Sequence, residues 1–378
     1  MKIALVISSL EVGGAESQFH LIALQLKDDG HQVEVWLLRK RGDFIAPLES
    51  AGIPVRDLNK QGRLDLVRPT INIRRFARDF LPNAIFCSLP SACLHALAAK
   101  SVCPGAVFCW QIVATRSTLP EYGFVAGMGY LIQRLAANFC DHYISNSRAG
   151  AISAIDEGYS RSKMHVLQNG IDTARFEPNP DAGKAWLLRN GLDPHRPVIG
   201  IVGRLDPAKD HHTFFKAIKC LEAQMSGTAQ YVVLGRGSGE HADSVMEEIH
   251  ALQQQGISIV HVEHETDMPQ VYSALNIFTM TSVSEGLPNA LLEALACGAF
   301  CVATNVGDCA EVIANDGVLV NVNDHGAIST VWYEKLTSAE NIADKQVQRV
   351  HKKYGLKPMV NSLSYILSRK QPSQDYLL

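Results

Sequence analysis

Short aliphatic segments alternate with helical stretches along the whole chain, and this alternation limits the fold more than any other feature. Residues 2–8 are apolar at nearly every position, which is typical of a strand buried on both faces. Such strands alternating with helices form parallel sheets covered by helices on both sides. The sequence therefore predicts an α/β protein with doubly wound sheets. A first series of strands is expected at residues 2–8, 33–38, 53–58, 83–88, 107–112 and 142–145.

The alternation is interrupted once, by a proline-rich stretch that follows Asn169 and Gly170. Because a domain usually holds about 100–200 residues, the 378-residue chain fits two domains. We expect a first domain at residues 1–170, a second at 171–345, and a helical tail at 346–378 that packs back onto the first. A second series of strands is expected at residues 198–203, 229–234, 257–262, 277–280, 300–303 and 318–320.

The composition is that of a soluble globular protein, with 47% hydrophobic and 19% charged residues. The sequence has no apolar run near the length of about 18 residues that spans a bilayer, and its apolar start is expected to be a strand. Nine cysteines without a Cys-x-x-Cys pair indicate reduced thiols in a cytoplasmic protein. A net charge of −3 gives no reason to expect a nucleic-acid partner.

The charge is distributed unevenly, because residues 1–170 carry 18 Lys and Arg against 14 Asp and Glu. Five arginines of this part are interleaved with apolar residues. Two interpretations remain open, a solvated helical face and a peripheral surface that meets anionic lipid and a lipid-linked acceptor. The residues are Arg63, Arg68, Arg74, Arg75 and Arg78, with Leu66, Ile71, Ile73 and Phe76 between them.

Two turns that follow predicted strands have the composition of an anion site. Gly13 and Gly14 open a helix, so backbone N–H groups and the positive helix end can meet a phosphate, with a plain glycine turn as the alternative. Arg204 can fork onto phosphate oxygens while Lys209 supplies a point charge, which together suit a diphosphate. A solvated loop is the alternative for this pair.

A third turn, residues 235–239, begins with Gly235 and is rich in glycine. Glu240 breaks the spacing of a dinucleotide-binding fingerprint, so this motif is weak evidence for a nicotinamide-dependent oxidoreductase. That interpretation would also leave Arg204 and Lys209 unexplained.

The segment VSEGLPNALLE, residues 283–293, is the most specific in the chain. Glu285 precedes a predicted helix, Pro288 lies near its first turn, and Gly298 is in the C-cap position. Glu293 lies about two turns inside that helix among apolar residues. A partly buried carboxylate there needs a hydrogen-bond donor such as a pair of hydroxyls, whereas an exposed helix position is the alternative.

The motifs VGRLDPAKDH, VLGRGSG, EGLPNALLEALACG and NVGDCAEVI, in this order behind GGAE, resemble the retaining glycosyltransferases of family 4 over nearly the whole chain. The resemblance implies the GT-B fold, with two Rossmann-like domains and a C-terminal helix that returns to the first. It also implies a nucleotide-sugar donor held mainly by the second domain and an acceptor held by the first.

The same resemblance assigns roles to individual residues. Glu285 and Glu293 match the E-x7-E motif, with Glu285 at the donor sugar and Glu293 at the ribose hydroxyls. Arg204 and Lys209 contact the diphosphate. The resemblance assigns catalytic roles to these two residues and to Glu285. The remaining donor-binding residues are Gly14, Gly235, Gly286, Leu287, Pro288 and Asn289, and the acceptor-binding residues are Gly13 and Gln111.

The sequence departs from the family pattern in two places. Many members carry a histidine after the strand expected at 107–112, whereas this chain has Gln111, Thr115 and Arg116 there and no histidine from His95 to His142. The stretch before Asp267, which often contains glycine in relatives, has the sequence Glu-His-Glu at 263–265.

The expected chemistry explains these residue types, because cleavage of the donor builds negative charge on the diphosphate and positive charge on the anomeric carbon. The sequence contains no Asp-x-Asp, so we expect metal-independent transfer with a nucleotide sugar, favouring UDP, and no other cofactor. The resemblance favours bacterial surface-polysaccharide or O-antigen assembly, at the cytoplasmic face of the inner membrane if the arginine surface meets lipid. A non-catalytic nucleotide-sugar-binding protein is the remaining alternative.

Overall fold

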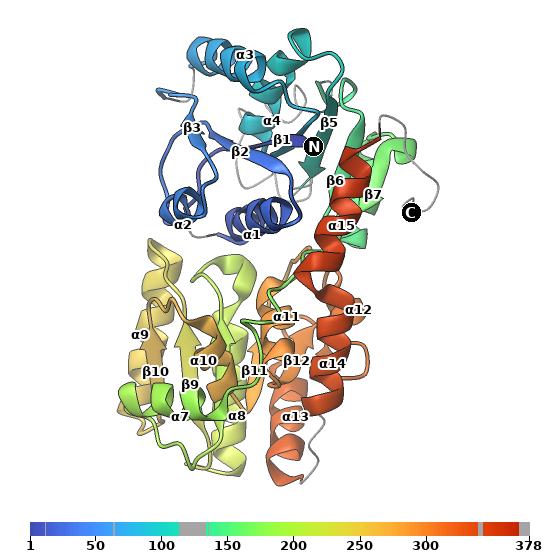
Figure 1. Cartoon of the computed structure of the whole chain (residues 1–378). Helices are drawn as coiled ribbons and strands as arrows, with labels where there is room; N and C mark the ends of the chain where they lie inside the picture. The colour runs from blue at the N-terminus through green and yellow to red at the C-terminus, as the bar shows by residue number, and fades with distance from the viewer. Residues whose placement is uncertain (12, 63–64, 113–133, 135, 339–342, 370–378) are drawn as a thin grey trace. The chain divides into compact units, whose positions relative to one another are not determined.

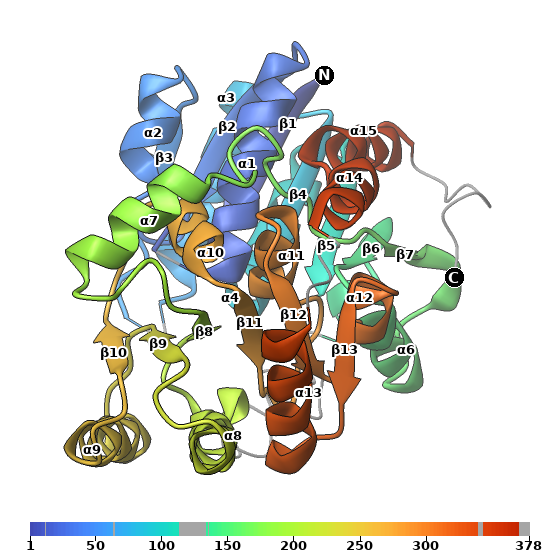
Figure 2. The same cartoon turned by 90° about the horizontal axis from the view of Figure 1, so that it is seen from below.

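The structure is a computed structural model that describes residues 1–11, 13–62, 65–112, 134, 136–338 and 343–369. The chain divides into two units, one formed by Met1–Gly170 with Leu356–Leu378 and the other by Ile171–Gly355. Each unit is built on its own parallel sheet (Figures 1 and 2).

The sheet of the first unit has seven strands in the order β3-β2-β1-β4-β5-β6-β7, and all neighbours are parallel. Parallel neighbours need crossover connections, which the intervening helices supply. The strands are β1 (Lys2–Ile7), β2 (Gln32–Leu37), β3 (Val55–Asp57), β4 (Ala84–Ser88), β5 (Val107–Ile112), β6 (His142–Ser145) and β7 (Met164–Val166). The helices are α1 (Gly14–Asp28), α2 (Ile45–Ser50), α3 (Val67–Phe80), α4 (Pro90–Ala96), α6 (Arg148–Asp156) and α15 (Leu356–Leu367), with 3-10 turns at Leu97–Ser101 and Arg161–Lys163.

Alternate residues of β1 pack on opposite faces of this sheet. Ile3 and Leu5 belong to a core with α1 and α15, whereas Ala4 and Val6 belong to a core with α3 and α4. Burial on both faces explains the continuous apolar run of this strand in the sequence. The predicted doubly wound architecture is therefore confirmed for the first unit.

The second unit has six parallel strands in the order β10-β9-β8-β11-β12-β13. Helices α8 and α13 pack on one face, and α7, α10, α11 and α14 pack on the other. The strands are β8 (Val198–Val202), β9 (Gln230–Leu234), β10 (Ile259–Val262), β11 (Ile277–Met280), β12 (Phe300–Thr304) and β13 (Gly317–Val320). The helices are α7 (Pro180–Arg189), α8 (His211–Gln224), α9 (Glu240–Gln254), α10 (Met268–Ala274), α11 (Asn289–Ala296), α12 (Cys309–Ile313), α13 (His325–Thr337) and α14 (Ala343–Tyr354), with a 3-10 turn at Pro207–Lys209.

The C-terminal part of the chain contributes to both units. Val350 and Tyr354 of α14 are buried in a core of the second unit, which ends at Gly355. Helix α15 instead packs beside α1 in the first unit, where Val360 and Leu363 are fully buried (Figure 1). The return to the first unit therefore begins at residue 356, whereas the sequence predicted it at residue 346.

The predicted strands agree with the observed ones at both ends for β5, β6 and β11, and the others differ by one or two residues at one or both ends. Strand β7 was not predicted, because His165 interrupts its short apolar sequence and no aliphatic run marks it. Within the described residues, no helix has the length and apolar composition needed to cross a bilayer.

Candidate functional site

The glycine-rich turn after β9 packs tightly against the turn after β8. Gly235 has φ +150°, and a Cβ atom on it would lie 1.9 Å from the carbonyl oxygen of Gly203. The carbonyl of Gly235 also contacts His261 Nε2 at 2.8 Å, and Gly203 N donates to Leu234 O at 2.9 Å. Only glycine fits this position, so Gly235 brings together two loops at the carboxyl ends of the strands, the edge where open α/β sheets bind ligands.

The loop after β8 is held by its own aspartates and by a threonine from the loop after β11. Asp206 accepts from Ala208 N at 2.9 Å, and Asp210 caps α8 by accepting from Thr213 N and Oγ1. The buried hydroxyl of Thr281 donates to the carbonyl oxygens of Lys209 and Asp210 at 2.8 and 2.9 Å. These bonds fix the backbone that carries Lys209.

Lys209 and Glu285 form an ion pair between the two loops. Lys209 Nζ lies 2.5 Å from Glu285 Oε1, and the side chains are 26% and 12% exposed. Ser282 Oγ donates to the same carboxylate oxygen at 2.6 Å. The structure thus brings together two residues that sequence reasoning assigned to the diphosphate and to the donor sugar, and in the free chain they neutralise each other.

Arg204 lies apart from this pair. Its guanidinium Nη2 is 3.5 Å from Asp206 Oδ2, and the side chain is 78% exposed. An exposed arginine with a single weak partner is free to turn towards an incoming anion.

The loop after β12 supports the backbone on which Glu285 lies. Gly307 has φ +54°, and a Cβ atom on it would be 2.3 Å from Glu285 O and 2.5 Å from Gly286 O. Asp308 N donates to Gly286 O at 3.0 Å. The NVGD motif, residues 305–308, therefore has a structural role that the sequence did not reveal. It packs against the backbone of Glu285 and Gly286 and holds it in place.

The rest of the VSEGLPNALLE segment leads into α11. Leu287 is buried, Pro288 is the N-cap residue, and Asn289 is the first residue of the helix. Gly298 follows the helix with φ +84°, as expected for a glycine that terminates it.

Glu293 is half-buried on α11 and accepts a hydrogen bond from the Tyr272 hydroxyl at 2.8 Å. Burial raises the pKa of Glu293 to about 7, although the Tyr272 hydroxyl and the charge of Arg175 act in the opposite direction. The requirement for a donor partner was predicted, but the partner is a tyrosine of α10 that no sequence signal identified. A carboxylate with this pKa binds hydroxyl donors best above neutral pH.

The residues predicted in the first unit lie at the carboxyl ends of its strands. Gly14 begins α1 and Gly13 is its N-cap residue, with an extended backbone and no side-chain cap. Gln111 is buried near the end of β5, and its Oε1 has no hydrogen-bond partner among the described residues. Thr115 and Arg116 lie outside the described residues.

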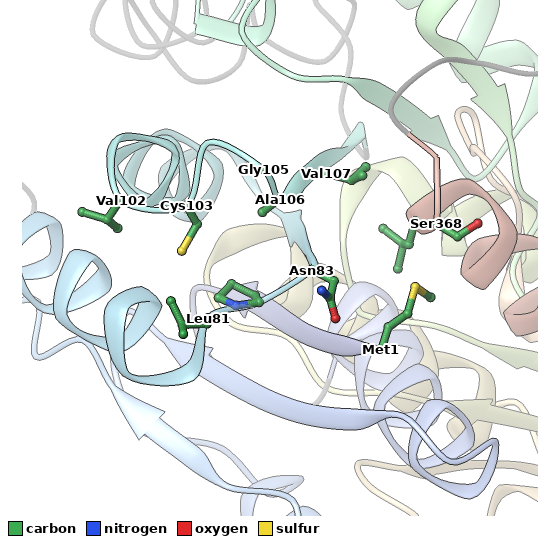
Figure 3. Close-up of a pocket in the computed structure, with 11 residues that line it drawn as sticks. Met1, Leu81, Asn83, Val102, Cys103, Gly105, Ala106, Val107 and Ser368 are labelled. Carbon is green, nitrogen blue, oxygen red and sulfur yellow. The ribbon is translucent and has the colours of Figure 1, made fainter.

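A cavity of about 470 Å³ lies at the opposite edge of this sheet, where β1, β4 and β5 begin. Figure 3 shows Met1, Asn83 and Val107 around it. Its position at the amino ends of the strands disfavours it as the main ligand site. Among the described residues, no group of three or more His, Cys, Asp or Glu side chains is placed to hold a metal ion.

The two doubly wound units and the return of α15 to the first unit define the GT-B fold. A solved structure of Anabaena HepE in complex with UDP and glucose has this fold, with a TM-score of 0.83 over 97% of this chain and 99% of that chain. The sequences are 20% identical, so this likeness establishes the fold alone. The predicted fold class is confirmed.

Both units match known protein families. Residues 12–175 match the family described as Glycosyltransferase Family 4, and residues 196–332 match Glycosyl transferases group 1. The chain belongs to this glycosyltransferase family, which confirms the resemblance seen in its motifs.

Two curated relatives show the range of the family. One is the Escherichia coli UDP-Gal:alpha-D-GlcNAc-diphosphoundecaprenol alpha-1,3-galactosyltransferase, 28% identical over 43% of this chain and 42% of the relative. The other is the lipopolysaccharide core biosynthesis mannosyltransferase LpsB of Rhizobium meliloti, 31% identical over 42% of this chain and 46% of the relative. The chain spans about half the length of the curated relatives it matches.

Proposed function

We propose that this protein is a retaining, metal-independent glycosyltransferase that moves a sugar from a nucleotide diphosphate sugar, favouring UDP, to a glycan or lipid-linked glycan. The observation that carries the proposal is the Lys209–Glu285 ion pair at the carboxyl edge of the second sheet, with the exposed Arg204 on the same loop as Lys209. A cation for the departing diphosphate and a carboxylate for the sugar are thereby held in one place.

The ion pair has a direct role in this reaction. An incoming diphosphate competes with Glu285 for Lys209, and the released carboxylate then faces the donor sugar. Lys209 and Arg204 stabilise the negative charge that develops on the leaving nucleotide, while Glu285 stabilises the positive charge at the anomeric carbon or holds a sugar hydroxyl. Glu293 holds the ribose hydroxyls from α11.

The first test is the metal requirement. Because Arg204 and Lys209 supply the charge, we expect the protein to release UDP from a UDP-sugar at nearly the same rate with and without chelator, measured by a coupled UDP assay over a panel of UDP-sugars with acceptor glycans. Loss of activity in chelator with recovery in magnesium or manganese would contradict the metal-free mechanism. Tight nucleotide binding without turnover on any acceptor would instead favour the non-catalytic alternative.

The acceptor class follows from the relatives. The E. coli galactosyltransferase acts, by its name, on a sugar linked to diphosphoundecaprenol, and the Rhizobium enzyme serves lipopolysaccharide synthesis. We extend this to the present chain as an acceptor that is part of a bacterial surface polysaccharide, modified at the cytoplasmic face of the inner membrane.

The exposed surface of helix α3 supports a contact with the membrane. Leu66, Val67 and Ile71 are 60–66% exposed, which is unusual for large apolar side chains on a charged helix. Ile73 and Phe76, in contrast, are buried in the core of the unit. Exposed arginines accompany the apolar residues, namely Arg68, Arg74, Arg75 and Arg78, whereas Arg63 lies outside the described residues. An apolar edge beside several cations is suited to an anionic lipid surface.

Charge reversal on this helix should weaken vesicle binding. Each cation near an anionic membrane contributes about 1 kcal/mol, so we expect the Arg74→Glu, Arg75→Glu variant to bind vesicles with anionic lipid at least tenfold more weakly in sedimentation. Added salt should weaken the wild type, because screening acts over about 8 Å at physiological ionic strength. The matched control reverses two exposed cations of the second unit, Lys184→Glu and Lys216→Glu. Equal vesicle binding by all three proteins would contradict the membrane contact and favour the interpretation of α3 as a solvated helical face.

A further inference from the structure

A second cavity, of about 240 Å³, lies in the first unit where β1, β2 and β4 end. It is at the carboxyl edge of the sheet, where open α/β sheets bind ligands. Its polar lining consists of three cations and three hydroxyls, namely Arg39, Arg41, Lys60, Ser8, Ser9 and Ser91. The volume suits a small group rather than a whole nucleotide.

The backbone around the cavity is fixed by hydrogen bonds between the ends of the strands. Arg39 N donates to Ser8 O at 3.1 Å, and Lys60 N donates to Leu38 O at 2.9 Å. Gly42 has φ +124°, and a Cβ atom on it would lie 1.9 Å from the carbonyl carbon of Leu10. Only glycine permits this approach, so the loop that carries Arg39 is held against the end of β1.

The ammonium of Lys60 is positioned by a backbone carbonyl and by the buried ring of His95. Lys60 Nζ donates to Asp65 O at 2.8 Å and lies 3.1 Å from Nε2 of His95, which is 5% exposed. His95 Nδ1 is 3.3 Å from Thr70 Oγ1, whose hydroxyl donates to Leu66 O. Burial, with a contribution from Lys60, lowers the pKa of His95 to about 4, so the ring is a neutral acceptor at physiological pH. Two of the three ammonium hydrogens are thereby used, and the third has no partner among the described residues, so it is available to a ligand.

The positive charge in this cavity is only partly neutralised. Arg41 pairs with Glu11 at 3.1 Å, but in the described part of the chain no carboxylate lies within ion-pair distance of Arg39 or Lys60. Burial lowers the pKa of Lys60 and the charge of Arg39 adds to this effect, whereas Asp65 opposes it. Because Asp65 offsets only part of the positive charge of Lys60, and Arg39 has no ion-pair partner among the described residues, the cavity favours a bound anion.

We propose that this cavity binds a phosphate group of the acceptor, so that the acceptor is a phosphate or diphosphate ester of a sugar. The hydroxyls of Ser8 and Ser91 and the cations of Arg39 and Lys60 match the several oxygens of a phosphate better than the two of a carboxylate, whereas the Ser9 hydroxyl donates to Glu11 at 3.2 Å. The donor diphosphate has its own cations, Arg204 and Lys209, in the second unit. The assignment to the acceptor rests on the proposed transferase function, whereas the binding of phosphate does not.

Binding of inorganic pyrophosphate tests the site directly. Calorimetric titrations would be run with saturating UDP present, which occupies a donor site if one exists. Because a charge-assisted hydrogen bond is lost, we expect Arg39→Gln and Lys60→Met to weaken pyrophosphate binding by about 10- to 100-fold. The control is Lys40→Gln, which removes the same charge from the neighbouring residue, whose ammonium pairs with Glu49 outside the cavity. Its affinity should remain within about twofold of wild type. Thermal unfolding of each variant verifies the fold.

Equal pyrophosphate affinity in wild type and Arg39→Gln, or an equal loss in Lys40→Gln, would overturn the proposal. The result is independent of sugar transfer. A protein that binds pyrophosphate through Arg39 but turns over no nucleotide sugar would contradict the transferase function and leave the phosphate site supported.

A competition experiment then identifies the source of the phosphate. N-acetylglucosamine 1-phosphate and a short polyprenyl diphosphate sugar should displace pyrophosphate, whereas the methyl glycoside of the same sugar should not. Stronger displacement by the polyprenyl compound assigns a lipid-linked acceptor, stronger displacement by the sugar phosphate assigns a soluble one, and displacement by the methyl glycoside would contradict phosphate recognition.

Discussion

Glu285→Gln should reduce turnover of the sugar donor by about a hundredfold or more without weakening nucleotide binding, because the carboxylate competes with the diphosphate for Lys209. The amide keeps the shape of the side chain, and its oxygen can still accept from Ser282 and Lys209, which lie within 2.6 Å of the carboxylate oxygen. The variant removes the negative charge beside the reacting sugar, and loss of one transition-state contact costs on the order of 100-fold in rate. Initial rates with the full donor and calorimetry with the nucleotide alone would separate the two effects.

The matched control for this variant is Glu311→Gln on α12. Glu311 also pairs with a lysine, Lys353, at 2.9 Å in the same unit, but it lies outside the loops of the candidate site. Its turnover should match wild type. If Glu285→Gln turned over donor at the wild-type rate, the assigned role of Glu285 would be lost.

Glu293→Ala should weaken nucleotide binding, in contrast to Glu285→Gln, whose main effect is on turnover. Removal of a charged acceptor from hydroxyl groups costs roughly 1.5–3 kcal/mol, so nucleotide affinity should fall by about 10- to 100-fold in calorimetry. Glu293→Gln keeps one acceptor oxygen and should lose less. A folded Glu293→Ala protein that binds nucleotide like wild type would exclude the ribose contact.

The same residue predicts the pH dependence of binding. Glu293 has its pKa raised to about 7, so the free protein carries a proton on this side chain below neutral pH. A ligand that donates hydroxyls prefers the ionised carboxylate, so affinity should fall about tenfold from pH 8 to pH 6 as the group takes up its proton. Glu293→Ala should lack this component, and its comparison with wild type removes the contribution of the titrating nucleotide phosphates. A wild-type protein with the same pH profile as the variant would contradict the assignment.

The strands and the glycine turns were predictable because their signals are local. A buried strand leaves an aliphatic run, and a close backbone approach such as that of Gly235 and Gly203 demands glycine at a fixed place. The contact of Lys209 with Glu285 joins loops far apart in the chain, so no local pattern records it. The same holds for the Tyr272 hydroxyl on Glu293 and for Gly307 behind Glu285.

The division of the C-terminal helices was less predictable for a different reason. Helices α14 and α15 both have amphipathic spacing, and spacing shows that a helix buries one face without showing which core receives it. Likewise, the arginines around α3 indicated a charged helix, but the spacing did not show that Leu66 and Ile71 are exposed beside them.

The placement of α15 has a consequence for how the chain folds during synthesis. The second unit is continuous from Ile171 to Gly355, whereas the first takes Val360, Leu363 and Ile366 from the far end of the chain into the core beside β1 and α1. While the ribosome is still translating the second unit, this face of the first sheet is covered by α1 but lacks α15, so the part of the core that α15 buries is open to water. The core of the first unit is therefore completed only after residues 356–367 have been made, so full stability of its sheet comes after synthesis of the second unit, against the usual N-terminal-first order of domain folding.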